Sequence, residues 1–288
     1  MSLRINTNVS ALTAYQNLSR NQNEMASSIE KLSSGLRINK AADDAAGLSI
    51  SQGLTSQING LTQAVSNAQD GINVSQIADG ALGTSQQILQ RMRTLVVQAG
   101  NSGTQDANSL SAINSEVTSL NTQLDNISKQ TKFGATNLLD GTYNNTFQVG
   151  ANGGDTVALD LSKASTLSTA VGGTGGEDLT ALKIAAGTSP TTYSSADATA
   201  DLASIDKAIK AISGARSGIG AVQNQLNYTV SNLQTGITNV TASRSNLTDA
   251  DLATEVSKMT QSQILSQAAT SVLAQANSAP QSILKLLQ

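Results

Sequence analysis

The sequence predicts a mainly α-helical protein. We expect a long antiparallel helical bundle or coiled coil built from both chain termini, with a small β-hairpin region in the middle. Aliphatic residues recur at steps of three and four over long stretches. Residues 1 to about 140 and about 202 to 288 are poor in glycine and almost free of proline. Four of the six aromatic residues lie between 133 and 193, with a glycine-rich run, which is typical of strands and turns.

The first predicted helix has its apolar residues on one face. It ends near Ser33-Ser34-Gly35, because glycine readily takes the left-handed conformation found at helix ends. Two further helices follow in the N-terminal half, separated by a predicted break at Gly100-Asn101-Ser102-Gly103. The first of the two carries Leu54, Ile58, Leu61, Val65, Ala68 and Ile72, then, after a phase shift, Ala78, Ala81, Ser85, Ile88, Met92, Leu95 and Ala99. The second carries Leu110, Ile113, Val117, Leu120, Leu124 and Ile127.

The middle of the chain, at about 141–200, is predicted to be a β-rich hairpin excursion. Its glycine-rich run is Val171-Gly172-Gly173-Thr174-Gly175-Gly176. This run lacks the lysine of a phosphate-binding P-loop and the G-x-G-x-x-G spacing, so a flexible hairpin loop is the better interpretation.

The C-terminal half contains the longest pattern. Eleven of fourteen positions are aliphatic in the series Leu202, Ile205, Ile209, Ile212, Arg216, Ile219, Gln223, Leu226, Val230, Leu233, Ile237, Val240, Arg244 and Leu247. A helix of this length is a rod of roughly 70 Å. The arginines that interrupt it are interpreted mainly as solvated flanks or local ion pairs, with a role in register or subunit contacts as the alternative.

The last predicted helix starts at Thr248-Asp249-Ala250-Asp251, where acids suit the positive end of the helix dipole. Pro280 is expected to kink or end it. Both terminal segments carry few charges, so we expect them to become ordered when neighbouring copies bury them. The candidate self-assembly seams are Leu18, Met25, Ile29, Leu32, Leu252, Val256, Met259, Leu265, Val272 and Leu273.

The composition excludes several classes of function. The chain has no Cys, His or Trp, and only 2% aromatic residues. It therefore lacks thiolate nucleophiles, the commonest general base and the usual metal ligands, so we expect no catalysis, no cofactor and no metal. The adjacent Asp43 and Asp44 are read as helix caps rather than a catalytic pair. A net charge of -3 argues against nucleic acid, and no apolar run is long enough to span a membrane.

Specific motifs then identify a resemblance. Leu32-Ser33-Ser34-Gly35-Leu36-Arg37-Ile38-Asn39, followed by Ala42-Asp43-Asp44-Ala45-Ala46-Gly47-Leu48, resembles the N-terminal signature of bacterial flagellins. The same family is matched by Ile5-Asn6-Thr7-Asn8, Asn67-Ala68-Gln69-Asp70-Gly71-Ile72, Gln90-Arg91-Met92-Arg93, residues 121–134 and residues 243–287. The resemblance covers roughly residues 1–150 and 202–288.

The resemblance implies a fold and a function. Residues 1–43 and 246–288 would form a terminal coiled coil (D0), and residues 44–245 a helical rod (D1), in a short flagellin with little or no outer domain. The subunit would polymerise into the flagellar filament for swimming motility. Its partners would be other copies of itself, an export chaperone and cap or junction proteins. It would be extracellular, and the family's type III-like export agrees with the absence of an apolar signal-peptide core near the N-terminus.

The resemblance also implies a receptor-facing patch. In flagellins recognised by Toll-like receptor 5 of hosts, an Arg and a Leu on the second helix and a Glu on the third face the receptor. The matching positions are Arg91, Leu95 and Glu116. An acidic residue common just before the Leu in enterobacterial relatives is Thr94 here.

Two alternatives belong to the same superfamily. A hook-filament junction protein would share the helical termini, but its signature typically runs Ser-Thr-Gly and then Pro-Ser-Asp-Asp-Pro. This chain has Ser33-Ser34-Gly35 and Ala41-Ala42-Asp43-Asp44-Ala45 instead, which favours flagellin. Flagellins that carry a zinc protease need His-Glu-x-x-His, which a chain without histidine excludes.

Overall fold

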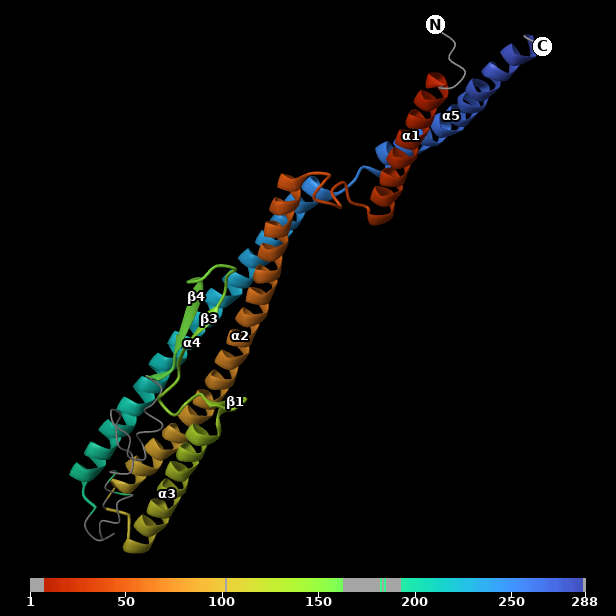
Figure 1. Cartoon of the computed structure of the whole chain (residues 1–288). Coiled ribbons are helices and arrows are strands. Elements are labelled where there is room, and N and C mark those ends of the chain that lie inside the picture. The colour runs from red at the N-terminus through yellow and green to blue at the C-terminus, as the bar shows by residue number, and fades with distance from the viewer. Residues whose placement is uncertain (1–7, 102, 163–181, 183, 185–192, 287–288) are drawn as a thin grey trace. The chain divides into compact units, whose positions relative to one another are not determined.

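The computed structural model describes residues 8–101, 103–162, 182, 184 and 193–286. In these residues the helices are α1 (Val9–Ser34), α2 (Ala45–Ala99), α3 (Ala107–Gln130), α4 (Ser195–Thr248) and α5 (Leu252–Leu286) (Figure 1). The chain divides into two compact units, one of Met1–Ile58 with Thr238–Gln288 and one of Asn59–Ile237. The predicted mainly α-helical class, with small antiparallel hairpins in the middle of the chain, is confirmed.

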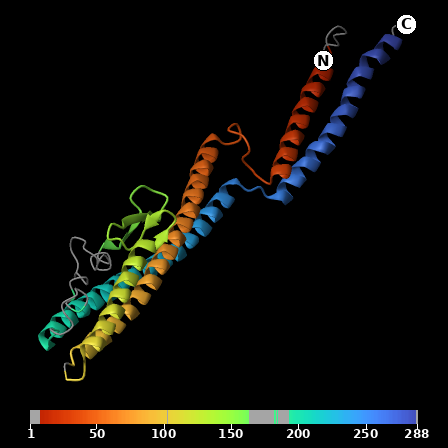
Figure 2. The ribbon, with the colours of Figure 1, turned by 90° about the horizontal axis from the view of Figure 1, so that it is seen from below.

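In the first unit, α1 and α5 lie side by side and run antiparallel (Figures 1 and 2). The Asn8 side chain caps α1 by accepting the Ala11 N–H at 3.1 Å. The helix ends at Gly35, whose φ of 71° only glycine adopts without strain. The predicted end of this helix is confirmed.

A short extended link precedes α5. Leu36 and Asp249 form an antiparallel bridge, flanked by a hydrogen bond from the Arg37 N–H to the Thr248 carbonyl at 2.7 Å. Asp251 then caps α5, because its carboxylate accepts the Ala253 N–H at 3.0 Å and the Thr254 hydroxyl at 2.8 Å. These bonds hold the pKa of Asp251 below its usual value, the Thr254 hydroxyl being the largest cause. The predicted cap cluster is confirmed, although Thr248 closes α4 rather than opening α5.

The sequence predicts that Pro280 kinks or ends the last helix, and it does not end it, since α5 continues to Leu286. Proline has no N–H to donate to the carbonyl four residues earlier, which belongs to Ala276. That carbonyl accepts a hydrogen bond from Asn8 Nδ2 at 2.8 Å. The side chain of Asn8, which caps α1, thus supplies the donor that the Ala276 carbonyl lacks because of the proline.

The second unit contains the main part of α2, all of α3 and the main part of α4. The predicted break is confirmed, because α2 ends at Ala99 and Asp106 caps α3. The core is almost entirely aliphatic. Its largest fully buried side chains are Leu82, Leu89, Met92, Leu95, Leu124, Leu138, Leu139, Leu159, Leu161 and Leu182.

Arg216, which interrupts the long apolar pattern of α4, forms the predicted kind of local ion pair. Its Nε donates to Asp79 Oδ1 at 2.8 Å and its Nη1 donates to Gln86 Oε1 at 2.8 Å, both on α2. These bonds raise the pKa of Arg216, with the hydrogen bond to Asp79 as the largest cause. The arginine therefore ties α4 to α2 at one position of their seam.

Two small antiparallel sheets follow α3. Strands β1 (Lys132–Phe133) and β2 (Thr136–Asn137) pair around Gly134, so strand structure starts earlier than the predicted 141. Strands β3 (Asn144–Gln148) and β4 (Thr156–Asp160) pair in full register. In β4, Val157 and Leu159 are buried while their neighbours are exposed, which is the alternation of a half-buried strand. The predicted glycine-rich loop at 172–176 lies outside the described residues.

The β3–β4 hairpin is fixed to α2. Asn67 Nδ2 donates to the Gln148 carbonyl at 3.0 Å, and Phe147 lies against Gly71. Among the described residues, none of the helices combines the length and apolar character that crossing a lipid bilayer requires.

Candidate functional site

The α1–α5 pair has a narrow seam of small and polar residues. The residues buried along it are Ala14, Ser28, Glu255 and Ser262. Their spacings are multiples of seven within each helix, so one face of each helix meets the other. Small side chains let the two helices approach closely and leave the larger apolar residues at the flanks.

Ser28 and Glu255 form the central contact of this seam. The Ser28 hydroxyl donates to Glu255 Oε1 at 2.8 Å, and both residues are buried. Lys258 Nζ lies 3.4 Å from Glu255 Oε2. The Ser28 hydrogen bond, and after it the positive charges of Lys258 and Lys31, hold the pKa of Glu255 below its usual value. Burial acts in the opposite direction.

The ten seam residues predicted from the sequence fall into two groups. Leu18, Met25, Leu32, Met259 and Leu273 are half-buried. Ile29, Leu252, Val256, Leu265 and Val272 are exposed. Sequence reasoning missed the buried polar residues of the α1–α5 contact, because it followed apolar residues only. The heptad spacing from Glu255 to Ser262 is the signal that could have found them.

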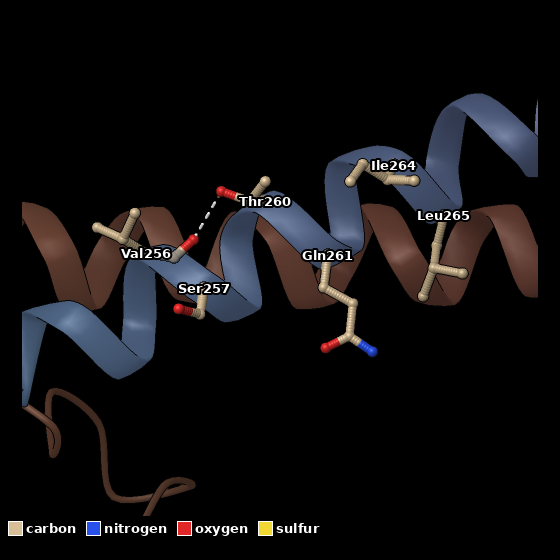
Figure 3. A pocket seen from close by; sticks show the side chains of 6 residues that line it. All are labelled: Val256, Ser257, Thr260, Gln261, Ile264 and Leu265. Atoms are coloured by element: carbon tan, nitrogen blue, oxygen red, sulfur yellow. Dashed lines mark hydrogen bonds between the residues drawn. The ribbon is translucent and has the colours of Figure 1, made fainter.

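Large apolar side chains on α1 and α5 remain uncovered. They include Val9, Leu12, Tyr15 and Ile264 in addition to the exposed predicted residues. A shallow open groove of about 470 Å³ on α5 is lined by Val256, Ser257, Thr260, Gln261, Ile264 and Leu265. Figure 3 shows these side chains on the helix, with the Thr260 hydroxyl turned back to the Val256 carbonyl at 2.8 Å. A surface of this kind is typical of a protein–protein contact.

The predicted receptor-facing residues lie on α2 and α3 in the second unit. Arg91 Nη2 is 2.7 Å from Glu116 Oε1, and their side chains are 56% and 43% exposed. Leu95 is only 2% exposed and belongs to the core. The structure therefore brings Arg91 and Glu116 together at the surface, while Leu95 is buried. The Thr94 hydroxyl donates to the Gln90 carbonyl at 3.0 Å on the same helix.

The side chains of Asp43 and Asp44 both accept hydrogen bonds from backbone N–H groups. Asp43 Oδ2 accepts the N–H groups of Asn39 and Lys40, each at 3.0 Å, and these bonds lower its pKa. Asp44 Oδ1 accepts the Gly47 N–H at 2.8 Å in the first turn of α2. Asp44 therefore acts as the predicted helix cap, whereas Asp43 closes the turn that precedes α2 and caps no helix. The described part of the chain contains no group of three acidic residues placed to hold a metal ion.

The family models match most of the chain. Residues 5–144 match the bacterial flagellin N-terminal helical region, and residues 202–287 match the bacterial flagellin C-terminal helical region. The two matches take in α1 to α3 and nearly all of α4 and α5.

Individual relatives are similar to this chain over their full length. The chain is 42% identical over 306 aligned positions to a flagellin of Bacillus subtilis, covering 99% of this chain and 100% of the relative. It is 35% identical over 377 positions to flagellin D of Vibrio cholerae, with both fully covered. The alignment with the Vibrio cholerae flagellin is longer than this 288-residue chain, so that relative contains insertions that this chain lacks. The crystal structure of Bacillus cereus flagellin is 26% identical with a TM-score of 0.46, covering 58% of this chain and 88% of that chain. The chain belongs to the bacterial flagellin family.

Proposed function

We propose that this flagellin polymerises into the flagellar filament through the exposed apolar faces of α1 and α5. Membership of the family makes it a self-assembling structural component of the extracellular flagellum. This proposal rests on one observation. Large apolar side chains of α1 and α5 are exposed, whereas the residues buried between the two helices are small or polar. Burying them against other copies removes apolar area from water, at about 25 cal/mol per Å².

The finer features follow from the same proposal. Residues 1–43 and 246–288 form the inner layer D0, and residues 44–245 form D1, with structural rather than catalytic roles. The subunit leaves the cell by the flagellar export route. An export chaperone and cap or junction proteins contact the terminal helices, which carry the apolar surface that such partners need.

Single substitutions on α5 test the assembly surface. An Ile264→Asp variant should remain folded, because Ile264 is 60% exposed in the monomer, but should fail to form filaments. Its matched control is Ile264→Val, which keeps an apolar side chain and should polymerise. Electron microscopy gives the filament length and circular dichroism checks the fold. Long filaments from Ile264→Asp would overturn the assigned surface. Short assemblies from the unaltered chain would instead favour the junction protein.

We further propose that the monomer is recognised by Toll-like receptor 5 at Arg91, Leu95 and Glu116. The exposed ion pair between Arg91 and Glu116 supports this, because arginine is a frequent interface anchor. Leu95 is buried, so it contributes by packing in the core of the helices rather than by direct contact.

A matched arginine on the same helix gives a control for the receptor test. Arg93 is bonded to Asp206 at 2.8 Å and is similarly exposed. Arg91→Ala should reduce signalling in a receptor reporter cell line, and Arg93→Ala should have a smaller effect. Full signalling by Arg91→Ala combined with Glu116→Gln would contradict these positions.

A further inference from the structure

The chain contains two Asn-Gly pairs, Asn59–Gly60 and Asn152–Gly153. In such a pair the backbone nitrogen of the glycine can attack the Cγ atom of the asparagine side chain. Glycine makes this attack easier than any other residue, because it has no Cβ and its backbone is freely adjustable. Whether the attack occurs depends on the local backbone.

The two pairs differ in their backbone rather than in the exposure of the asparagine. Asn59 and Asn152 are both exposed. Asn59–Gly60 lies inside α2, where helical hydrogen bonds hold the backbone, and Gly60 also lies against Ala151. Asn152–Gly153 lies in the connection between β3 and β4.

Gly153 is exposed and has open surroundings. Nothing lies within 4 Å of the position that a Cβ would take on Gly153. Its N–H donates no hydrogen bond in the described part of the chain. The next residue, Gly154, has a φ of 103° and an equally open Cβ position, so two successive glycines without side-chain neighbours follow Asn152.

We propose that Asn152–Gly153 is a site of spontaneous modification in the folded protein. The Gly153 nitrogen forms a bond to Asn152 Cγ, the bond from Cγ to the side-chain nitrogen breaks, and ammonia leaves with the proton of the Gly153 amide. Water then opens the resulting succinimide at either carbonyl. The products are aspartate and isoaspartate at position 152.

The modification alters a bonded part of the hairpin. The Asn152 carbonyl accepts from Gln148 Nε2 at 2.6 Å and from the Asp155 N–H at 3.4 Å. An isoaspartate inserts a methylene group into the backbone and displaces this carbonyl. Either product also adds a negative charge close to Asp155. Both effects weaken the connection between β3 and β4.

Incubation of the full-length monomer at mildly alkaline pH tests the proposal. After proteolysis, tandem mass spectrometry should find a gain of about 1 Da at Asn152, and a protein-isoaspartate methyltransferase should methylate the peptide. Asn59 is the internal control and should stay unchanged while α2 is folded. Gly153→Ala should slow the reaction roughly tenfold, because a Cβ hinders the attack. Circular dichroism confirms that this variant folds. Conversion of Asn152 no faster than that of Asn59, or unchanged by Gly153→Ala, would overturn the proposal.

Discussion

The Asn8 side chain donates from Nδ2 to the Ala276 carbonyl at 2.8 Å, joining the start of α1 to the last turns of α5. In a regular α-helix the Ala276 carbonyl accepts from the N–H of residue 280. That residue is proline, which has no N–H. The same asparagine caps α1 through Oδ1. One side chain therefore satisfies two helix groups that lack partners within their own helices.

Replacing Asn8 by aspartate separates these two functions. Aspartate still caps α1, but it cannot donate to the Ala276 carbonyl. We expect Asn8→Asp to lower the local stability of α5 after Ala276 by about 1 kcal/mol, measured as faster amide hydrogen exchange there. In a Pro280→Ala background the backbone N–H returns, so the same substitution should have a smaller effect. Equal effects in both backgrounds would contradict the assignment.

The Ser28–Glu255 contact predicts a pH dependence of the α1–α5 pair. The folded pKa of Glu255 is lower than that of the unfolded chain, mainly through the Ser28 hydrogen bond and then through Lys258 and Lys31. The resulting stability is present at neutral pH and is lost as the pH falls through the folded pKa. The protection of α1 and α5 amides against exchange, corrected for the slower intrinsic exchange in acid, should therefore fall under acid conditions.

Ser28→Ala should make that acid transition begin at a higher pH. Removal of the hydroxyl leaves a buried carboxylate with one donor fewer, at a cost of about 1–2 kcal/mol. Ser27 is exposed and gives the matched control, Ser27→Ala. If both variants lose exchange protection at the same pH as the unaltered protein, Ser28 does not stabilise the Glu255 carboxylate.

Substitutions of Leu95 and Arg91 should differ in their effect on the free energy of unfolding. Leu95→Ala removes a buried core side chain and should lower the free energy of unfolding by about 2–5 kcal/mol. Arg91→Ala breaks an exposed ion pair and should cost about 1 kcal/mol or less. Urea unfolding of the two variants measures the difference. A Leu95→Ala protein as stable as Arg91→Ala would show that the surrounding core does not depend on this leucine.

The long helices of this chain could be predicted from sequence because their seams are aliphatic and regular. The series from Leu202 includes Ile205, Ile212, Ile219 and Leu226, all of which are buried. The α1–α5 contact was harder, since its buried members are small or polar and no apolar periodicity marks them. The passage of α5 through Pro280 could not be predicted locally, because the compensating donor is 272 positions away in the sequence, at Asn8. The burial of Leu95 agrees with its place in the apolar series of α2, whereas the receptor-facing role comes only from the resemblance.

Gly71 controls how closely the β3–β4 hairpin approaches α2. A Cβ at this position would lie 3.1 Å from Leu226 Cδ1 and 3.2 Å from Phe147 Cδ2, closer than an ordinary carbon contact. We expect Gly71→Ala to displace Phe147 and to destabilise the second unit by about 1–2 kcal/mol, partly offset by better helix propensity. Thermal unfolding and the exchange rates of β3 amides measure the two effects.

Gly80 provides the control for this substitution on the same helix. It is exposed, and nothing lies within 4 Å of its Cβ position. Gly80→Ala should therefore show helix propensity alone and stabilise the protein by about 0.5–1 kcal/mol. The two alanine variants should thus change the melting temperature in opposite directions, because only Gly71 is needed for close approach. If Gly71→Ala also raised the melting temperature and left the β3 amides protected, Phe147 would have room to move and the hairpin's position would not depend on a glycine there.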